Sequence, residues 1–232
     1  MATNYVIERS HQSRYVRPLT FAGDGVCLAA QVDYPRTAPN FSGTYPLLFM
    51  LHHAGCHPLE HYAHYAHIGL ESGSAVFRWD KRGSGRSGAG GRGSTTQDAV
   101  NAYEIALEQE RVDPRRTVIL APAEGGLMLA ESFGLFARVQ QPMGVILAGN
   151  MLDADHIRAI SAPVLVISGE QDWMDWRTYG PQAAAAHKAR HDHGATFFLA
   201  KGADRGLMLE QDERVAFHKG ARQAIKSWLT AL

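Results

Sequence analysis

The sequence has little cysteine, no excess charge of either sign and no long apolar run. Its two cysteines, Cys27 and Cys56, are too few for a disulfide framework and do not have the spacing of a zinc site. Lysine plus arginine and aspartate plus glutamate number 23 each, so there is no general basic field to hold nucleic acid or an anionic membrane. No run reaches the roughly 18 apolar residues of a membrane-spanning helix. We expect reduced thiols, no nucleic-acid partner and no membrane partner.

The remaining composition is that of an ordinary folded protein. Of the 232 residues, 45% are hydrophobic and 20% are charged, a balance that favours one α/β domain over residues 1–232. The first residues, MATNYVIERSHQSRYV, contain no apolar stretch of signal-peptide length. We therefore expect a cytoplasmic protein.

Short apolar runs alternate with longer segments of helical pattern. The runs cover residues 26–34, 46–53, 75–80, 117–121, 143–149, 163–169 and 196–200. The helical patterns cover residues 59–73, 96–110, 124–139, 177–191 and 212–229. Apolar strands alternating with helices predict an α/β fold, with a doubly wound, mostly parallel twisted sheet covered by helices on both faces. The first two or three strands are expected to pair antiparallel.

Polar and glycine-rich sequences follow five of these strands. Ligands of such sheets bind outside the carboxyl ends of the strands, so these sequences are candidates for a site. They are His52-His53-Ala54-Gly55-Cys56-His57, Asp80-Lys81-Arg82-Gly83-Ser84-Gly85-Arg86-Ser87-Gly88, Ala121-Pro122-Ala123-Glu124-Gly125-Gly126, Gly169-Glu170-Gln171-Asp172-Trp173 and Gly202-Ala203-Asp204-Arg205-Gly206-Leu207.

In this order the sequences resemble those of the α/β-hydrolase family, from about residue 24 to near the end of the chain. The His-Gly-type oxyanion loop, the Asp-x-Arg-Gly-x-Gly-x-Ser loop and the Gly-Glu-x-Asp acid loop carry the resemblance. It implies the α/β-hydrolase fold. Only 13 residues separate the runs 143–149 and 163–169, where many members insert a lid, so the chain resembles a small lidless member without a large cap domain.

The chain departs from the family at two of its three catalytic positions. The elbow Gly-x-Ser-x-Gly reads Ala121-Pro122-Ala123-Glu124-Gly125, which places Ala123 at the nucleophile position. The position of the histidine is Arg205, and arginine stays protonated, so it cannot act as a general base. Only the acid, Asp172, matches. The triad is degenerate, and the ordinary acyl-enzyme mechanism is excluded.

Two origins of Ala123 remain open. It is either a natural departure or a replacement of serine made to trap a substrate, in which case the chain is a serine hydrolase with an engineered Ala123. Arg205 favours the natural departure, because arginine is not a usual choice for disabling a histidine.

Asp172 and Arg205 allow two interpretations. They form a salt bridge that replaces the Asp–His bond and holds the loops together, or Arg205, oriented by Asp172, binds a carboxylate or a developing oxyanion. The turn at Ala123 also has two interpretations. Backbone N–H groups at the following helix N-terminus, with a donor from His53, Ala54 or Gly55, would form an oxyanion hole, or the turn is a vestige kept for packing.

Proton transfer has several candidates. Glu124 either complements the helix dipole or acts as a base in the pocket. Among six histidines between 52 and 67, His52, His53 and His57 flank the proposed pocket, and one of them is expected to be a general acid or base. His57, with two later histidines, has i, i+4, i+7 spacing, but we expect a half-exposed helix surface there and no metal site. The others of the six are His61, His64 and His67.

The glycine-rich sequence 83–88 matches G-x-G-x-x-G, but the loop continues where a dinucleotide site requires a helix to begin. We interpret it as a structural loop in which Asp80 and Arg82 brace the ends of the sheet, and we expect no cofactor.

The sequence therefore predicts a cofactor-free enzyme that acts by non-serine chemistry on a small carbonyl or carboxylate compound. Lyase, isomerase, cyclase and direct-water hydrolysis remain open. The alternative is a catalytically inactive descendant that binds a small molecule or a protein, and a homo-oligomer is possible in either case.

Overall fold

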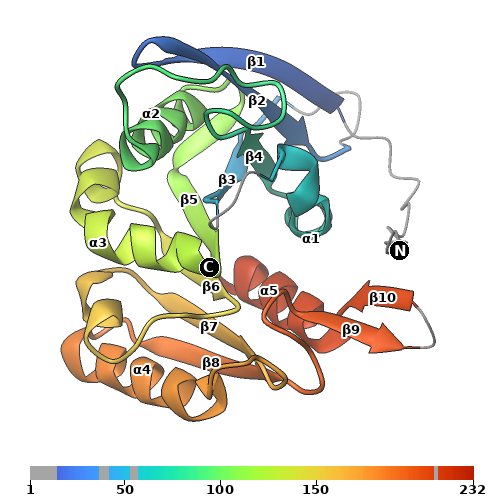
Figure 1. Ribbon diagram of the computed structural model, residues 1–232, viewed down its shortest axis with the longest axis vertical. Coiled ribbons are helices and arrows are strands. Elements are labelled where there is room, and N and C mark those ends of the chain that lie inside the picture. Colours follow the sequence, from blue (N-terminus) through green and yellow to red (C-terminus); the bar gives the residue numbers. More distant parts are fainter. Residues whose placement is uncertain (1–14, 37–41, 53–56, 212–213) are drawn as a thin grey trace.

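The computed structural model of the chain describes residues 15–36, 42–52, 57–211 and 214–232. Its main sheet has eight strands. They are β1 (Tyr15–Gly23), β2 (Val26–Tyr34), β3 (Tyr45–Met50), β4 (Ala75–Trp79), β5 (Val112–Pro122), β6 (Gly144–Ala148), β7 (Val164–Gly169) and β8 (Ala195–Ala200). Their order across the sheet is β1-β2-β4-β3-β5-β6-β7-β8, so the sheet twists from the β1–β2 hairpin to β8 (Figure 1).

β2 runs opposite to the other seven strands of the sheet. β1 pairs antiparallel with β2, and β2 pairs antiparallel with β4, whereas every later pair is parallel. The expectation that the first strands pair antiparallel is therefore confirmed for β2 and wrong for β3. β3 runs parallel to β4 because a helical crossover at residues 59–71 joins the two strands.

Helices cover both faces of the sheet (Figure 1). They are η1 (Leu59–Tyr62), α1 (Ala63–Glu71), α2 (Thr95–Leu107), α3 (Glu124–Val139), η2 (His156–Ala159), α4 (Trp176–Arg190) and α5 (Lys219–Ala231). α1 and α5 pack on one face, and α2, α3 and α4 pack on the other. Between β6 and β7 the chain forms only the short η2, so no large cap covers the sheet.

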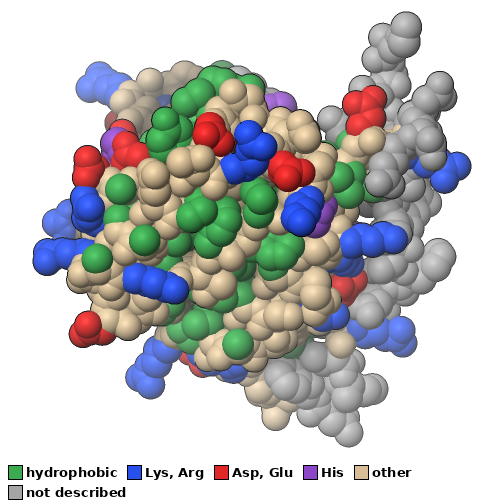
Figure 2. Space-filling view, turned by 90° about the horizontal axis from the view of Figure 1, so that it is seen from below, with side chains coloured by type: hydrophobic (Ala, Val, Ile, Leu, Met, Phe, Trp, Pro, Cys, Tyr) green, Lys and Arg blue, Asp and Glu red, His purple; other side chains and the backbone are tan. Residues whose placement is uncertain are grey.

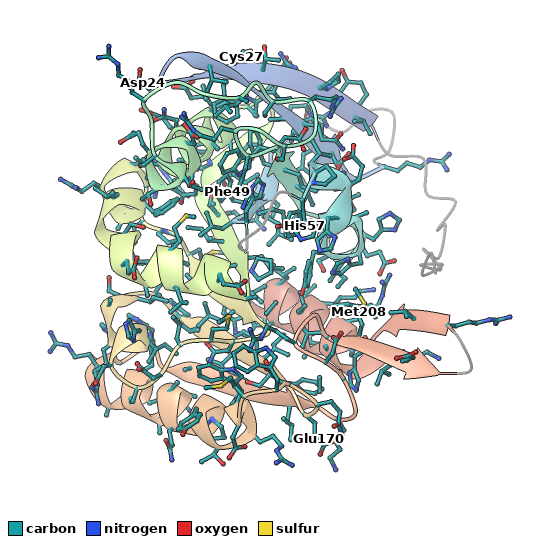
Figure 3. The ribbon with its side chains drawn as sticks, in the orientation of Figure 1. Asp24, Cys27, Phe49, His57, Glu170 and Met208 are labelled. Atoms are coloured by element: carbon teal, nitrogen blue, oxygen red, sulfur yellow. The ribbon has the colours of Figure 1, made fainter. Side chains whose placement is uncertain are left out.

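β3 shows why the strands are continuously apolar. Leu47, Phe49 and Leu51 pack into the core beneath α2 and α3, while Leu48 and Met50 pack into the core beneath α1. Alternate side chains of a strand point to opposite faces, and here both faces are buried. Figure 3 shows Phe49 in the interior, in contrast to Cys27 on the outer hairpin. No helix of the described residues is long and apolar enough to cross a membrane.

The expected helix 212–229 is wrong at its start. The chain first forms a hairpin of β9 (Met208–Gln211) and β10 (Arg214–Phe217). Phe217 packs its ring 5.3 Å from that of Tyr65 on α1, which draws this segment into an extended conformation. His218 then caps α5, because its Nδ1 accepts the N–H of Ala221 at 3.0 Å.

Candidate functional site

The turn between β5 and α3 has a strained backbone at Ala123. This residue has φ 45° and ψ −119°, a conformation that favours glycine, and α3 begins at the next residue. Its N–H donates to the carbonyl of Ala148 at 2.9 Å, and its own carbonyl accepts the N–H of Gly126 at 2.9 Å. A non-glycine residue in such a conformation costs about 1–3 kcal/mol and persists only where the surroundings impose it. The turn into α3 is thus sharp, and the side chain at its apex is a methyl group.

The end of β3 lies directly against the first turn of α3. A Cβ atom on Gly125 would lie 2.5 Å from the carbonyl oxygen of His52, so only glycine permits this approach. The chain therefore leaves β3 beside the helix N-terminus. His53, Ala54 and Gly55 lie outside the described residues, and the oxyanion donor expected from them stays a prediction.

Asp172 and Arg205 pair at the ends of β7 and β8. The Nε of Arg205 donates to one carboxylate oxygen at 2.9 Å, and its Nη2 donates to the other at 2.8 Å. The carboxylate is 1% exposed and the arginine side chain 16% exposed. The carbonyl of Asp204 would lie 2.0 Å from a Cβ on Gly169, so the two loops are pressed together. Such a forked pair is rigid.

Trp173 covers one face of the Arg205 guanidinium. The guanidinium carbon Cζ lies 4.4 Å from the centroid of the indole ring, a cation–π contact. The Nη1 group of Arg205 donates to none of the described residues. Arg205 therefore keeps hydrogen-bond donors for a ligand after its pairing with Asp172. No role for Trp173 is predicted from the sequence, although an aromatic residue directly after Asp172 was an available signal.

The elbow and the arginine meet at the end of β6. Ala148, the last residue of β6, accepts the N–H of Ala123. A Cβ on the following Gly149 would lie 2.1 Å from the carbonyl oxygen of Arg205. Both positions thus border the same strand end, and the structure brings together Ala123, Glu124 and the Asp172–Arg205 pair. Glu124 is the half-buried first residue of α3, where its charge complements the helix dipole.

The described histidines of the candidate set lie in different surroundings. His52 is buried, with its Nε2 2.5 Å from the carbonyl of Trp79 and its ring stacked 4.3 Å from the indole, so the structure places it in the core. His57 is half-buried and stacks on His61 at 4.2 Å, beside α1 (Figure 3).

The proposed common face of His57, His61 and His64 is wrong. His57 precedes the helix, and residues 59–62 form a 3-10 turn, so the α-helical spacing does not apply. His64 instead packs on Phe217 at 4.9 Å. Within residues 15–36, 42–52, 57–211 and 214–232, no group of three potential ligands is arranged to hold a metal.

In the glycine-rich loop after β4, the charged side chains form hydrogen bonds with neighbouring groups of the protein. Asp80 accepts the N–H groups of Leu59 at 2.7 Å and Arg86 at 2.8 Å. Arg82 forks onto both oxygens of Asp98 at 2.6 and 2.7 Å. α2 begins only at Thr95, after the loop. These contacts support the structural interpretation of the loop.

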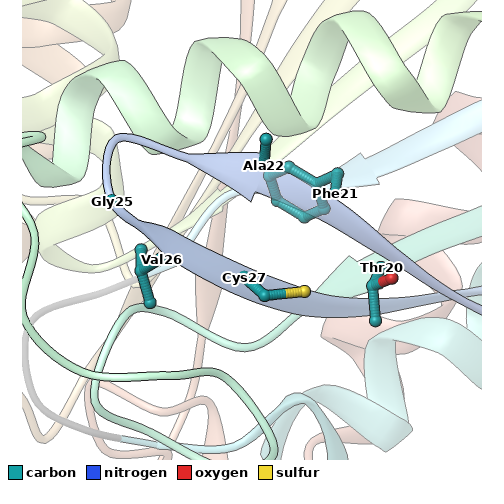
Figure 4. A pocket seen from close by; sticks show the side chains of 6 residues that line it. All are labelled: Thr20, Phe21, Ala22, Gly25, Val26 and Cys27. Carbon is teal, nitrogen blue, oxygen red and sulfur yellow. The ribbon is translucent and has the colours of Figure 1, made fainter.

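A separate hollow of about 490 Å³ lies on the β1–β2 hairpin (Figure 4). None of its residues belongs to the carboxyl ends of β5, β6, β7 or β8, so it is not part of the candidate site. The hollow is lined by Thr20, Phe21, Ala22, Gly25, Val26 and Cys27.

No family model and no curated protein sequence matches the chain. Solved structures do match it. A hypothetical protein from Pseudomonas aeruginosa is 14% identical with a TM-score of 0.71, over 99% of this chain and 97% of that one. Est1E from Butyrivibrio proteoclasticus, solved with ferulic acid, is 16% identical with a TM-score of 0.67, over 92% and 98%. A dienelactone hydrolase-like promiscuous phosphotriesterase from metagenomic libraries is 15% identical with a TM-score of 0.67, over 94% and 98%. At these identities the likeness establishes the fold that this chain shares with esterases and hydrolases.

Proposed function

We propose that this chain, whose fold is that of the α/β-hydrolases, is a cofactor-free enzyme that uses non-serine chemistry on a small carbonyl- or carboxylate-containing substrate. Negative charge that develops on the substrate is stabilised by the N–H groups at the start of α3 and by Arg205. The single observation that carries the proposal is the strained elbow at Ala123, retained beside an arginine that still has free donors.

The residues divide the chemistry as follows. Ala123 has no atom that can attack a carbonyl, so its methyl group leaves room for a substrate oxygen or a water. Arg205 stays protonated and donates hydrogen bonds to an enolate or oxyanion. Glu124 directly follows Ala123 as the first residue of α3 and is the first candidate to move the proton. His53 and His57 are the other candidates, as the sequence predicts. The burial of His52 makes it the weakest candidate for that task. Lyase, isomerase, cyclase and direct-water hydrolysis all use such a site.

Deuterium exchange tests the proposal without the natural substrate. Pyruvate in D₂O exchanges its methyl protons through an enolate, and ¹H NMR follows the loss of the methyl signal. We expect the chain to accelerate exchange above buffer and the double variant Asp172→Asn/Arg205→Gln to lower the catalysed rate at least tenfold, because it removes both charges together. Arg177→Gln, an exposed arginine on α4, is the control and should match the native rate. Equal rates in the native chain and the double variant would contradict the role of Arg205.

A non-catalytic binder is the second candidate, and the two hydrogen bonds that pair Arg205 with the carboxylate of Asp172 favour it. A guanidinium already neutralised by a carboxylate gives a developing oxyanion less stabilisation than a free one. This candidate is supported if small carboxylates bind at Arg205 while the native chain leaves the exchange of pyruvate at the buffer rate.

An engineered Ala123 in a serine hydrolase is the third candidate. Ala123→Ser alone then reacts rapidly with a fluorophosphonate probe. Under the main proposal this variant stays unlabelled, because Arg205 cannot accept the proton of the serine hydroxyl. Labelling is read by intact-protein mass spectrometry.

A further inference from the structure

Trp173 is an exposed tryptophan that is held in one orientation. Its side chain is 77% exposed, whereas Trp79 and Trp176 are 1% and 7% exposed. The ring stacks on Arg205, and Arg205 is itself locked by both oxygens of Asp172. An exposed aromatic surface rimmed by polar residues marks an interaction site, and here the ring lies against the Arg205 guanidinium.

The apolar surface extends beyond the indole. Met174, the next residue, is 40% exposed, and Tyr179 on α4 is 44% exposed. Seen from below, over α4 and β8, hydrophobic side chains gather at the centre of the face and charged side chains lie near them (Figure 2). Beside Arg205, Trp173 therefore offers a ring a stacking contact, and the exposed Met174 directly follows it in the chain.

The charge beside this surface selects the ligand. One face of the guanidinium is covered by Trp173 and one edge is used by Asp172, which leaves the Nη1 edge for an anion. A carboxylate fits that edge by paired hydrogen bonds. A planar ring bonded to that carboxylate would extend beside the indole, whose aromatic face favours stacking with another ring.

We propose that Trp173 and Arg205 form a subsite for a planar aromatic carboxylate. The inference rests on the proposed function, because it names the substrate class of the same site. Trp173 is the specificity-determining residue and Arg205 is the anion-binding residue.

Three probes of similar size separate the two contacts: benzoate, cyclohexanecarboxylate and benzamide. Benzoate has both the ring and the charge, cyclohexanecarboxylate has only the charge, and benzamide has only the ring. Binding is followed in ¹⁵N–¹H NMR spectra at the indole N–H of Trp173 and the Nε–H of Arg205. We expect benzoate to shift both signals and to bind at least fivefold more tightly than either other probe.

The matched variants are Trp173→Ala and Tyr15→Ala. Tyr15 is 66% exposed on β1, at the other edge of the sheet from β8. Read at Arg205, Trp173→Ala should weaken benzoate at least fivefold and change cyclohexanecarboxylate less than twofold. Tyr15→Ala should change neither affinity.

The outcomes separate the inference from the proposed function. Equal affinity for benzoate and cyclohexanecarboxylate in the native chain overturns the aromatic subsite and leaves the anion site standing. If no carboxylate shifts the Arg205 signal, both the subsite and the proposed role of Arg205 are wrong.

Discussion

Two arginine–aspartate forks lie at strand ends, and they differ in what surrounds the arginine. Arg82 and Arg205 are 17% and 16% exposed, and their partners Asp98 and Asp172 are each 1% exposed. The Nη1 of Arg82 donates to the carbonyl of Gly90 at 2.6 Å, so the loop closes around it. The Nη1 of Arg205 donates to no residue in the part of the chain that the structure describes, and an exposed indole covers one face of the guanidinium.

Under the proposed function, the difference separates a structural arginine, Arg82, from a ligand-binding arginine, Arg205, although the residue types are the same. In the loop after β4, the charges satisfy hydrogen bonds of the loop itself, and adding a ligand would break them. At the ends of β7 and β8, the fork orients the arginine and leaves donors for a ligand. Burial and pairing with aspartate are therefore the same for the two arginines, and the use of their Nη1 donors is what differs.

The largest expected difference between the two regions is in how much a glycine-to-alanine substitution lowers the free energy of unfolding. A Cβ on Gly85 would lie 2.3 Å from the carboxyl carbon of Asp80, and its φ is +53°. Gly85→Ala should lower the free energy of unfolding by about 3 kcal/mol, because it combines overpacking with a left-handed backbone. Gly206→Ala, beside Arg205, meets its nearest atom at 3.3 Å and should cost less than about 0.5 kcal/mol. Urea unfolding measures both, and equal losses would contradict the contrast.

Restoring the triad is expected to have the next largest effect. Asp172 is already in place to orient a histidine, so Ala123→Ser/Arg205→His should gain hydrolysis of p-nitrophenyl acetate and labelling by a fluorophosphonate. We expect at least a hundredfold gain over either single variant, about 2.7 kcal/mol in the barrier. A folded double variant no more active than its parents would show that positions 123, 172 and 205 are not aligned.

Acid should destabilise the chain through histidines outside the site. Burial, helped by His61, His67 and Arg78, lowers the pKa of His64 to about 3. Burial also lowers the pKa of His187. Below the ordinary histidine pKa of about 6.5, these two imidazoles bind protons in the unfolded chain but stay neutral in the folded chain. The free energy of unfolding therefore falls as the pH falls.

For His64 the loss should be about 1 kcal/mol per pH unit, beginning near pH 6.5 and ending near the folded pKa. Urea unfolding at pH 7 and pH 5 measures it. His64→Phe, which keeps the ring contacts with Tyr65 and Phe217, should flatten the dependence. The same slope in both proteins would show that His64 does not contribute.

The smallest expected effect concerns the strained elbow. Ala123→Gly should raise the free energy of unfolding by about 0.5–1 kcal/mol, because glycine adopts a positive φ at little cost. Thermal unfolding measures the gain. A loss of stability would show that the surroundings do not strain Ala123.

The parallel part of the fold could be predicted because its strands are buried on both faces. The helix expected over 124–139 was confirmed to the residue, since the elbow and its glycines mark the start. β1 was missed because it is an exposed edge strand without a continuous apolar run. The start of α5 was misplaced, because contact with α1, which is distant in the sequence, holds β10 extended.

The parts of the candidate site that directly follow a strand could be predicted from the sequence. Asp172 and Arg205 meet as their places after β7 and β8 require. Trp173 was not recognised as a partner of Arg205, because a side chain's stacking depends on the path of the loop and no spacing rule encodes it. His52 was placed by sequence beside the pocket, and only the structure shows its ring between Tyr62 and Trp79 in the core.

The central claim is that a negative charge binds between the start of α3 and Arg205. A titration with acetate, the smallest carboxylate with a carbon chain, tests it most directly. The signals to follow in ¹⁵N–¹H NMR spectra are the backbone N–H groups of Glu124 and Gly125 and the Nε–H of Arg205. The account predicts that all three shift with one dissociation constant and that Asp172→Asn/Arg205→Gln weakens it at least fivefold. Shifts at Glu124 and Gly125 that are unchanged in the double variant, or no shift in the native chain, would contradict it.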